Sequence, residues 1–200
     1  MVRLKRSAKL GILGVLEARR TSMPRIAREV DDAFRAVTLI RLFLAAEAPD
    51  ARRLDLELWK LLKRGSAILR AELSTQLAQL PHGPALTLRG LACDPDPDVA
   101  GPVLEHSAAL TDAAIAERAR CKGDAHLRAI AFRPHLHERI TSILVRRGGL
   151  PVLTRLSENR SANFTLDGRH TLERRLRHEA DAARRREFRQ PRHSEPHTLH

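Results

Sequence analysis

The chain has 200 residues, of which 42% are hydrophobic and only 3% aromatic, so one domain with a core of Leu, Ile, Val and Ala is expected. Its formal net charge of +12 favours an anionic partner, but residues 31–154 are almost neutral, with 17 basic and 15 acidic side chains. No apolar run approaches the roughly 18 residues that a membrane span requires. The composition therefore predicts a cytoplasmic protein without a membrane span.

The two cysteines, Cys93 and Cys121, lack the paired spacing of a zinc site or of a redox motif. They are interpreted as reduced, buried packing residues. Residues 1–24 are expected to form a basic, partly disordered segment. The apolar run at residues 10–16 contains two glycines and is followed by no small-residue cleavage site, so it is not interpreted as a secretory signal.

Apolar residues spaced by three or four predict a helix over residues 25–47. Its stripe consists of Ile26, Val30, Phe34, Val37, Ile40 and Leu44. A second apolar face, made of Leu39, Leu42 and Phe43, follows the second half of the helix. Neighbouring helices are therefore expected to enclose that end on two sides.

Longer packing helices are predicted to occupy residues 25–80. A turn at Pro49 and Asp50 is expected to precede a Leu-rich helix, which Gly65 ends. Ser66 is a natural N-cap for the helix that follows, because its hydroxyl can accept a hydrogen bond from a free backbone N–H.

From about residue 84 the helices are expected to shorten, because turn-forming residues recur at short intervals. In the sequence DPDPD, Asp96 is a natural N-cap and Pro97 a natural first helical residue. Pro102 is expected to keep the helix that follows short or kinked. The residues predicted to set the turns and caps of this region are Asp94, Pro95, Asp96, Pro97, Thr111, Asp124 and Pro134.

Short amphipathic segments of this kind cannot bury an apolar face alone, so they are expected to stack against their neighbours. The predicted fold is all-α, with short HEAT-like helical repeats at residues 84–166 stacked as an α-solenoid and preceded by the longer packing helices. In this scheme residues 25–166 form the helical repeat domain. Residues 167–200 form an Arg-rich C-terminal tail that is helical or disordered.

A family resemblance is carried by five segments: LIRLFLAAEAP, LACDPDPDVAGPVLEHSAALTD, GDAHLRAIAFRPHL, ITSILVRRGG and LSENRSANFT. In their order and spacing they resemble the bacterial domain-of-unknown-function family 2336, over roughly Thr38 to Asp167. The resemblance implies an all-helical domain with HEAT-like or leucine-rich-variant-like repeats, in a cytoplasmic bacterial protein without an assigned activity. It supplies no catalytic residues. Beyond Asp167 the likeness is expected to become loose, which leaves the C-terminal cap of the array undefined.

No metal, cofactor or catalytic site is predicted. His135 and His137 are two residues apart, and on a helix they would point away from each other. The carboxylates of Asp94, Asp96 and Asp98 are separated by prolines and lack the glycine and distal Glu of a calcium loop. The sequence also contains no phosphate-binding loop and no nucleophile elbow, so the chain is not expected to be an enzyme.

The predicted function is a non-enzymatic protein–protein interaction scaffold, with Arg128, Arg133 and Arg139 as candidate partner contacts. The alternative is nucleic-acid binding through the Arg-rich termini and a basic face of the array. That face would consist of Arg118, Arg120, Lys122, Arg128, Arg133, Arg139, Arg146 and Arg147. Acidic residues nearly balance it, and the array offers only Phe132 and Phe164 for base stacking. Self-association through an unfinished C-terminal repeat stays open as a third possibility.

Overall fold

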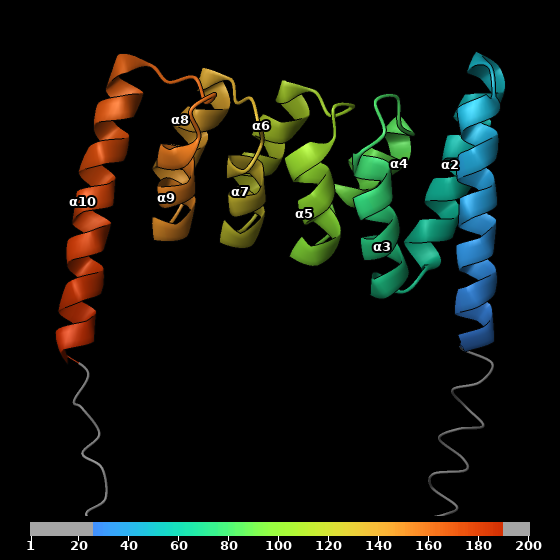
Figure 1. The fold of residues 1–200 in the computed structure, drawn as a ribbon, viewed down its shortest axis with the longest axis horizontal. Coiled ribbons are helices and arrows are strands. Elements are labelled where there is room, and N and C mark those ends of the chain that lie inside the picture. The colour runs from blue at the N-terminus through green and yellow to red at the C-terminus, as the bar shows by residue number, and fades with distance from the viewer. Residues whose placement is uncertain (1–25, 190–200) are drawn as a thin grey trace, which may run out of the picture.

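The computed structural model describes residues 26–189, and every regular element in that range is a helix, which confirms the all-α prediction (Figure 1). The predictions for residues 1–24 and 190–200 lie outside the described residues. A first helix spans residues 26–45. The helices after it are α2 (Ala48–Arg64), α3 (Ala67–Ala78), α4 (Ala85–Leu91), α5 (Pro97–His106), α6 (Asp112–Cys121), α7 (Asp124–Ala131), α8 (Glu138–Arg147), α9 (Leu150–Glu158) and α10 (Leu166–Arg189). None of the described helices is long and apolar enough to cross a membrane.

Alternate helices pack against one another, and this produces two rows (Figure 1). In one row α3 contacts α5, α5 contacts α7, and α7 contacts α9. In the other row α2 contacts α4, and α6 contacts α8. The helix of residues 26–45 stands at one end, and α10 stands at the other end, against α8 and α9. Each helix therefore contacts mainly its neighbours in the chain and the helices two places away.

Three helices begin at the predicted N-caps. The side chains of Ser66, Asp96 and Thr111 each accept a hydrogen bond from a backbone N–H two or three residues ahead, at 3.2, 3.0 and 3.3 Å. Pro97 is the first residue of α5, and Pro134 lies in the bend between α7 and α8. These local contacts fix where the helices of both rows start.

The predicted N-cap at Asp124 is wrong. Gly123 holds the N-cap position of α7, and Asp124 is the first residue inside that helix. The Asp124 carboxylate accepts a hydrogen bond from Gly149 N at 2.8 Å instead. A carboxylate is favoured near any helix N-terminus, and here it satisfies an amide at the start of α9, the next helix in the row.

Pro49 and Pro102 lie inside helices. The turn predicted at Pro49 and Asp50 is wrong, because α2 already begins at Ala48 and Pro49 is in its first turn, where the missing N–H has no helical partner to lose. Pro102 lies within α5, which continues to His106 and remains as short as predicted, at 10 residues.

The predicted burial of the two cysteines is also wrong, because Cys93 and Cys121 are exposed, although both are free, which agrees with the reduced state that was expected. Cys121 is the last residue of α6, and Cys93 follows the end of α4. Apolar neighbours in the sequence do not decide which way a side chain points where a helix ends.

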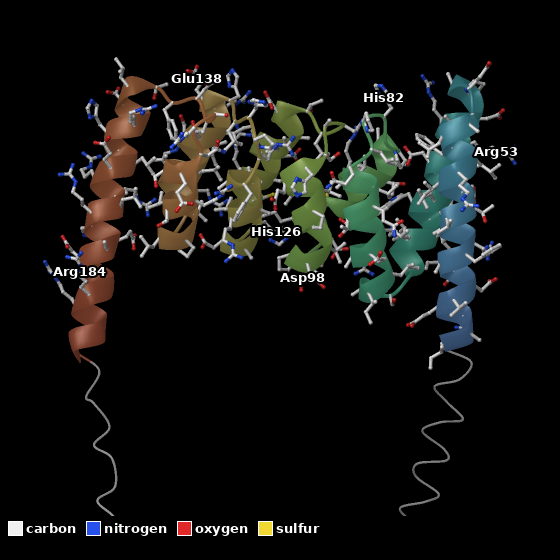
Figure 2. The ribbon with its side chains drawn as sticks, viewed as in Figure 1. Arg53, His82, Asp98, His126, Glu138 and Arg184 are labelled. Carbon is white, nitrogen blue, oxygen red and sulfur yellow. The ribbon has the colours of Figure 1, made fainter. Side chains whose placement is uncertain are left out.

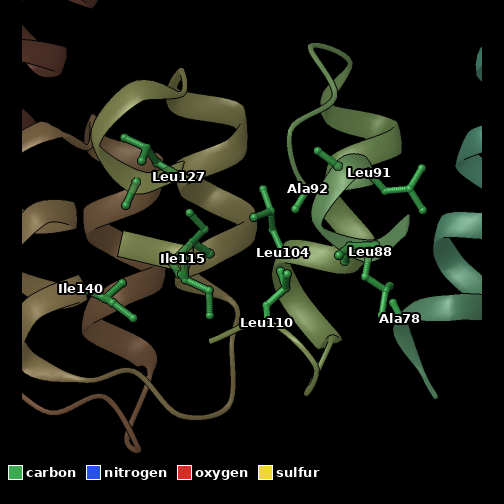
Figure 3. Packing of buried hydrophobic residues seen from close by; sticks show 14 of the residues in the cluster. Ala78, Leu88, Leu91, Ala92, Leu104, Leu110, Ile115, Leu127 and Ile140 are labelled. Atoms are coloured by element: carbon green, nitrogen blue, oxygen red, sulfur yellow. The ribbon is translucent and has the colours of Figure 1, made fainter. Parts of the chain in front are cut away.

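The core between the rows is aliphatic, as the composition predicts. Figure 3 shows Leu104, Leu110 and Ile115 among the buried side chains that fill the space between neighbouring helices. The single tryptophan, Trp59 of α2, packs its ring directly against Gly90 of α4, so that a Cβ at position 90 would overlap the ring. This close approach holds α2 and α4 together.

Candidate interaction groove

An open groove of about 680 Å³ crosses the row formed by α3, α5, α7 and α9. Most of its lining comes from α5 and α7, with Thr75 and Gln79 extending it toward α3 and Pro151 toward α9. Figure 2 shows Asp98, one of the lining residues, near one end of α5. The groove exists because these helices, which are separated along the chain, lie side by side.

Five of the lining residues are small or compact, and we call this set the floor of the groove. They are Gly101 and Pro102 from α5, Ala125 and Ala129 from α7, and Pro151 from α9. A Cβ at Gly101 would have a single neighbour within 4 Å, the Cβ of Ala129 at 4.0 Å. The space above Gly101 is therefore open, and a polypeptide backbone can approach the floor closely.

The charged residues of the lining are mainly acidic. Asp98, Glu105 and Asp124 contribute three carboxylates, against one guanidinium from Arg128. Glu105 Oε1 lies 3.4 Å from His106 Nε2, and the Asp124 carboxylate is bound to the backbone of α9. The groove therefore complements a cationic ligand better than an anionic one.

The lining contains one hydroxyl side chain, that of Thr75, which donates to the Ala71 carbonyl at 3.1 Å. Within residues 26–189 no group of three or more His, Cys, Asp or Glu side chains is placed to hold a metal ion. His135 and His137 lie in the extended segment before α8, not on a helix, and His137 is the N-cap of α8. The arrangement is suited to binding a ligand.

The three arginines predicted to form one contact surface are separated by the structure. Arg128 is exposed and lines the groove. Arg139 is exposed in the first turn of α8, which belongs to the other row. Arg133 lies after α7, and its side chain points into the protein. Only Arg128 therefore keeps its predicted place on a candidate binding surface.

Arg133 binds backbone carbonyls at the end of α5. Its guanidinium donates to the carbonyl of Leu104 at 2.7 Å and to that of Ser107 at 2.9 Å. Burial lowers the pKa of the Arg133 guanidinium below its usual value, and the Asp112 carboxylate acts in the opposite direction. The positive charge complements the negative C-terminal end of α5, so Arg133 joins α7 to α5.

Replacing Arg133 by Ala is expected to lower the free energy of unfolding by about 2–3 kcal/mol, because two carbonyls lose a charged donor. Replacing the exposed Arg128 by Ala serves as the control and should change it by less than about 0.5 kcal/mol. Urea titration followed by circular dichroism measures both. Equal losses for the two variants would show that the Arg133 contacts contribute nothing specific.

The same type of contact recurs along the chain. Polar side chains bind the carbonyls that end the helix two places earlier, and the bonded residues are 26 to 30 positions apart. All of these side chains lie at or just after the end of their own helix, except Arg175, which lies within α10. The residues that donate these bonds are Lys122, Arg133, Arg147, Asn159 and Arg175. These contacts were not predicted from the sequence. Lys or Arg residues near the C-terminal ends of predicted helices are nevertheless a sequence pattern that is typical of them. Arg133, Arg147 and Arg175 therefore have a structural role.

Asp94, predicted as a turn residue, connects several helices. Its carboxylate is ion-paired with Arg70 of α3 at 2.8 Å and accepts a hydrogen bond from Asp96 N at 3.0 Å. Its carbonyl oxygen is bound by Lys122 Nζ at 3.1 Å and lies 3.0 Å from Nε2 of the buried His126. The turn before α5 is thus held from both sides, while Pro95 is exposed beside it.

Over the described residues, the fold is all-helical, and its successive helices pack in rows with a groove across one of them. Residues 99–194 match the model of a family described as "Uncharacterised protein conserved in bacteria (DUF2336)". This match confirms the family resemblance predicted from the sequence motifs. It begins later than the expected Thr38, and it continues past Asp167, where the likeness was expected to become loose, so α10 lies within the family region. Comparisons with curated proteins and with solved structures gave no match.

Proposed function

We propose that the chain is a non-enzymatic scaffold for another protein in the cytoplasm, and that the groove across α3, α5, α7 and α9 holds a segment of that partner. The observation that supports this proposal is the extent of the groove, which draws its lining from four helices of one row. A partner segment that follows the row contacts several helices at once, as ligands of helical-repeat proteins do.

The lining also favours a particular chemistry for the partner. The small floor at Gly101 accommodates an extended backbone, and the carboxylates of Asp98 and Glu105 favour Lys or Arg side chains on it. Arg128 would contact an acidic or carbonyl group of the same segment. The proposed ligand is therefore an extended, predominantly basic polypeptide segment.

Nucleic-acid binding is the alternative, and one observation favours it: α10 exposes several arginines, among them Arg174, Arg177 and Arg184. Other observations favour the protein scaffold. Cations expected on the basic face, such as Lys122 and Arg133, bind helix ends instead. The two aromatic rings of the array each have a guanidinium over one face, at 4.0 Å for Phe132 and at 5.5 Å for Phe164.

A pull-down from native bacterial lysate distinguishes the two functions. The tagged full chain is used in nuclease-treated and untreated halves, and the bound proteins are identified by mass spectrometry. A stoichiometric protein that survives nuclease and moderate salt supports the scaffold. Material that disappears with nuclease, and that elutes as the salt concentration rises, would replace the scaffold with the nucleic-acid alternative.

Filling the groove is expected to remove the captured protein. Gly101→Leu places a side chain over the floor and should weaken binding at least about tenfold, as measured by calorimetry with the purified partner. Gly101→Ala is the matched control, since its methyl group meets only Ala129 at an ordinary distance. The Ala variant should bind normally and stabilise α5 by about 0.5–1 kcal/mol. If the Leu variant binds as tightly as the Ala variant, the groove is not the binding surface.

A further inference from the structure

The helix of residues 26–45 exposes an apolar stripe at the end of the array. The residues along its outer side are Ala27, Val30, Phe34, Val37, Arg41 and Leu44. Phe34 is 73% exposed, Val30 65% and Leu44 56%. The predicted apolar stripe is thus present, but most of it points away from the protein, because Ala36 and its neighbours on the opposite side face the core. We call these six residues the outer seam.

The outer seam has the spacing of a coiled-coil interface. Its members alternate between steps of three and four residues, which places them on one line of a helix that faces a partner helix. Five of the six are apolar, and Arg41 is the exception. Terminal helices of stacked arrays usually turn a polar face outward, so an apolar seam here indicates a missing partner.

The seam is complementary to itself when two copies run antiparallel. A pairing centred between Phe34 and Val37 places each of these residues opposite the other across a two-fold axis. The small Ala27 then lies opposite the large Leu44, and Phe34 lies opposite the smaller Val37, so a larger side chain faces a smaller one in both pairs. A parallel pairing would instead place Phe34 against Phe34 and the two Arg41 side chains against each other.

The charges also favour the antiparallel arrangement. In that pairing Arg41 lies opposite Val30 of the other copy, directly beside the exposed Asp31 that follows Val30. Two such Arg41–Asp31 pairs form, one on each side of the axis. Within one chain these residues cannot meet, because ten residues of helix separate them by about 15 Å.

The apolar area is close to what a dimer requires. The exposed parts of Phe34, Val30, Leu44 and Val37 amount to on the order of 400 Å² per copy. Two copies bury on the order of 800 Å² before the flanking polar residues are counted, and specific interfaces begin near ~1,000 Å². At the other end of the array α10 buries Leu172 and partly buries Leu176 against the core.

We infer that a second copy of this chain covers the outer seam, giving a two-fold dimer in which the helices of residues 26–45 pair antiparallel. The inference is independent of the groove, which lies on a different set of helices. It also gives the dimer two grooves, so that a partner with two binding segments would be held more tightly than by one copy.

Sedimentation velocity and light scattering of the full chain test this inference. At micromolar to submillimolar concentrations the wild type should have twice the mass of one 22.4 kDa chain. Phe34→Glu should give the single-chain mass, because a carboxylate is placed at the two-fold axis. Ile68→Glu is the matched control on α3, outside the seam: Ile68 is 79% exposed, and the dimer should persist. Circular dichroism verifies that both variants remain helical.

A charge exchange tests the antiparallel register. Asp31→Arg alone and Arg41→Asp alone should each weaken the dimer by about tenfold, because like charges then face each other. Mixing the two single variants should restore an affinity close to that of the wild type, since every contact between the two different chains then joins Arg to Asp. A parallel pairing already places Arg41 against Arg41 in the wild type, so in that pairing Arg41→Asp alone should not weaken the dimer, and the mixture should bind more tightly than the wild type instead of matching it.

Three results would overturn the inference. The first is a wild-type chain that remains a monomer at every concentration, which would mean that another segment or another molecule covers the seam. The second is a dimer that is insensitive to Phe34→Glu. The third is a dimer that Phe34→Glu dissociates but that mixing the charge variants does not restore, which would exclude the antiparallel register.

Discussion

Replacing Asp55 by Ala is expected to lower the free energy of unfolding by about 3–4 kcal/mol, a large fraction of the stability of an ordinary domain. Asp55 lies in α2 and is buried. Its carboxylate accepts hydrogen bonds from Leu86 N at 2.8 Å, from Thr87 N at 2.9 Å and from Thr87 Oγ1 at 2.7 Å. All three bonds disappear with the carboxylate.

The expected loss is large because Asp55, which lies in α2, accepts hydrogen bonds from the first amides of α4, as an N-cap residue of α4 would. The N-cap residue of α4 is Pro84, which has no side-chain acceptor, and α4 has only 7 residues. A helix this short depends on its tertiary contacts, because its few intrahelical hydrogen bonds do not offset the free-energy cost of forming the first helical turn. Without Asp55 the first amides of α4 are left without a protein acceptor in a buried position.

Asp50→Ala is the matched control for Asp55→Ala. Asp50 is an exposed carboxylate in the first turn of the same helix, so its loss should cost less than about 1 kcal/mol. Urea denaturation measures both variants, and hydrogen exchange locates the damage, which should concentrate in α2 to α4. Equal destabilisation by the two variants would mean that the contacts of Asp55 with α4 are not stabilising.

The helix starts that were predicted correctly share one physical feature, which is that their contacts are local. Asp96 and Thr111 bond to amides two or three residues away, and those amides are determined by the sequence next to the cap. Asp55 and Asp94 bond to residues 24 to 32 positions away, which no local pattern specifies. A buried Asp in a Leu-rich helix nevertheless indicates that it has a partner, because an unpaired buried carboxylate is costly.

The same distinction applies to the two candidate surfaces. Spacing predicts the stripe that includes Phe34, but periodicity shows only that residues share a face and not whether a neighbour covers it. The groove was not predicted, because it forms between helices that are separated along the chain. Asp124 was assigned to turns and caps, and Arg128 was the one lining residue proposed as a partner contact.

Replacing Asp94 by Ala is expected to lower the free energy of unfolding by about 3 kcal/mol and to weaken the packing of α3, α5 and α7. The variant removes the ion pair with Arg70, which is 20% exposed, and the acceptor for Asp96 N. It also frees the turn whose carbonyl binds Lys122, so the contact between the end of α6 and the turn before α5 weakens as well.

Asp98→Ala in the same DPDPD sequence is the control for Asp94→Ala. Asp98 is exposed, and its carboxylate stabilises the protein mainly by its interaction with the N-terminus of α5. Its replacement should therefore lower the free energy of unfolding by less than about 1 kcal/mol. Asp94→Ala should raise hydrogen exchange in α3, α5 and α7 while leaving α9 and α10 nearly unchanged, because each helix contacts mainly helices one and two places away. An increase spread evenly from α2 to α10 would show that the described helices unfold as one cooperative unit, and that the contacts of Asp94 do not divide the array into separable parts.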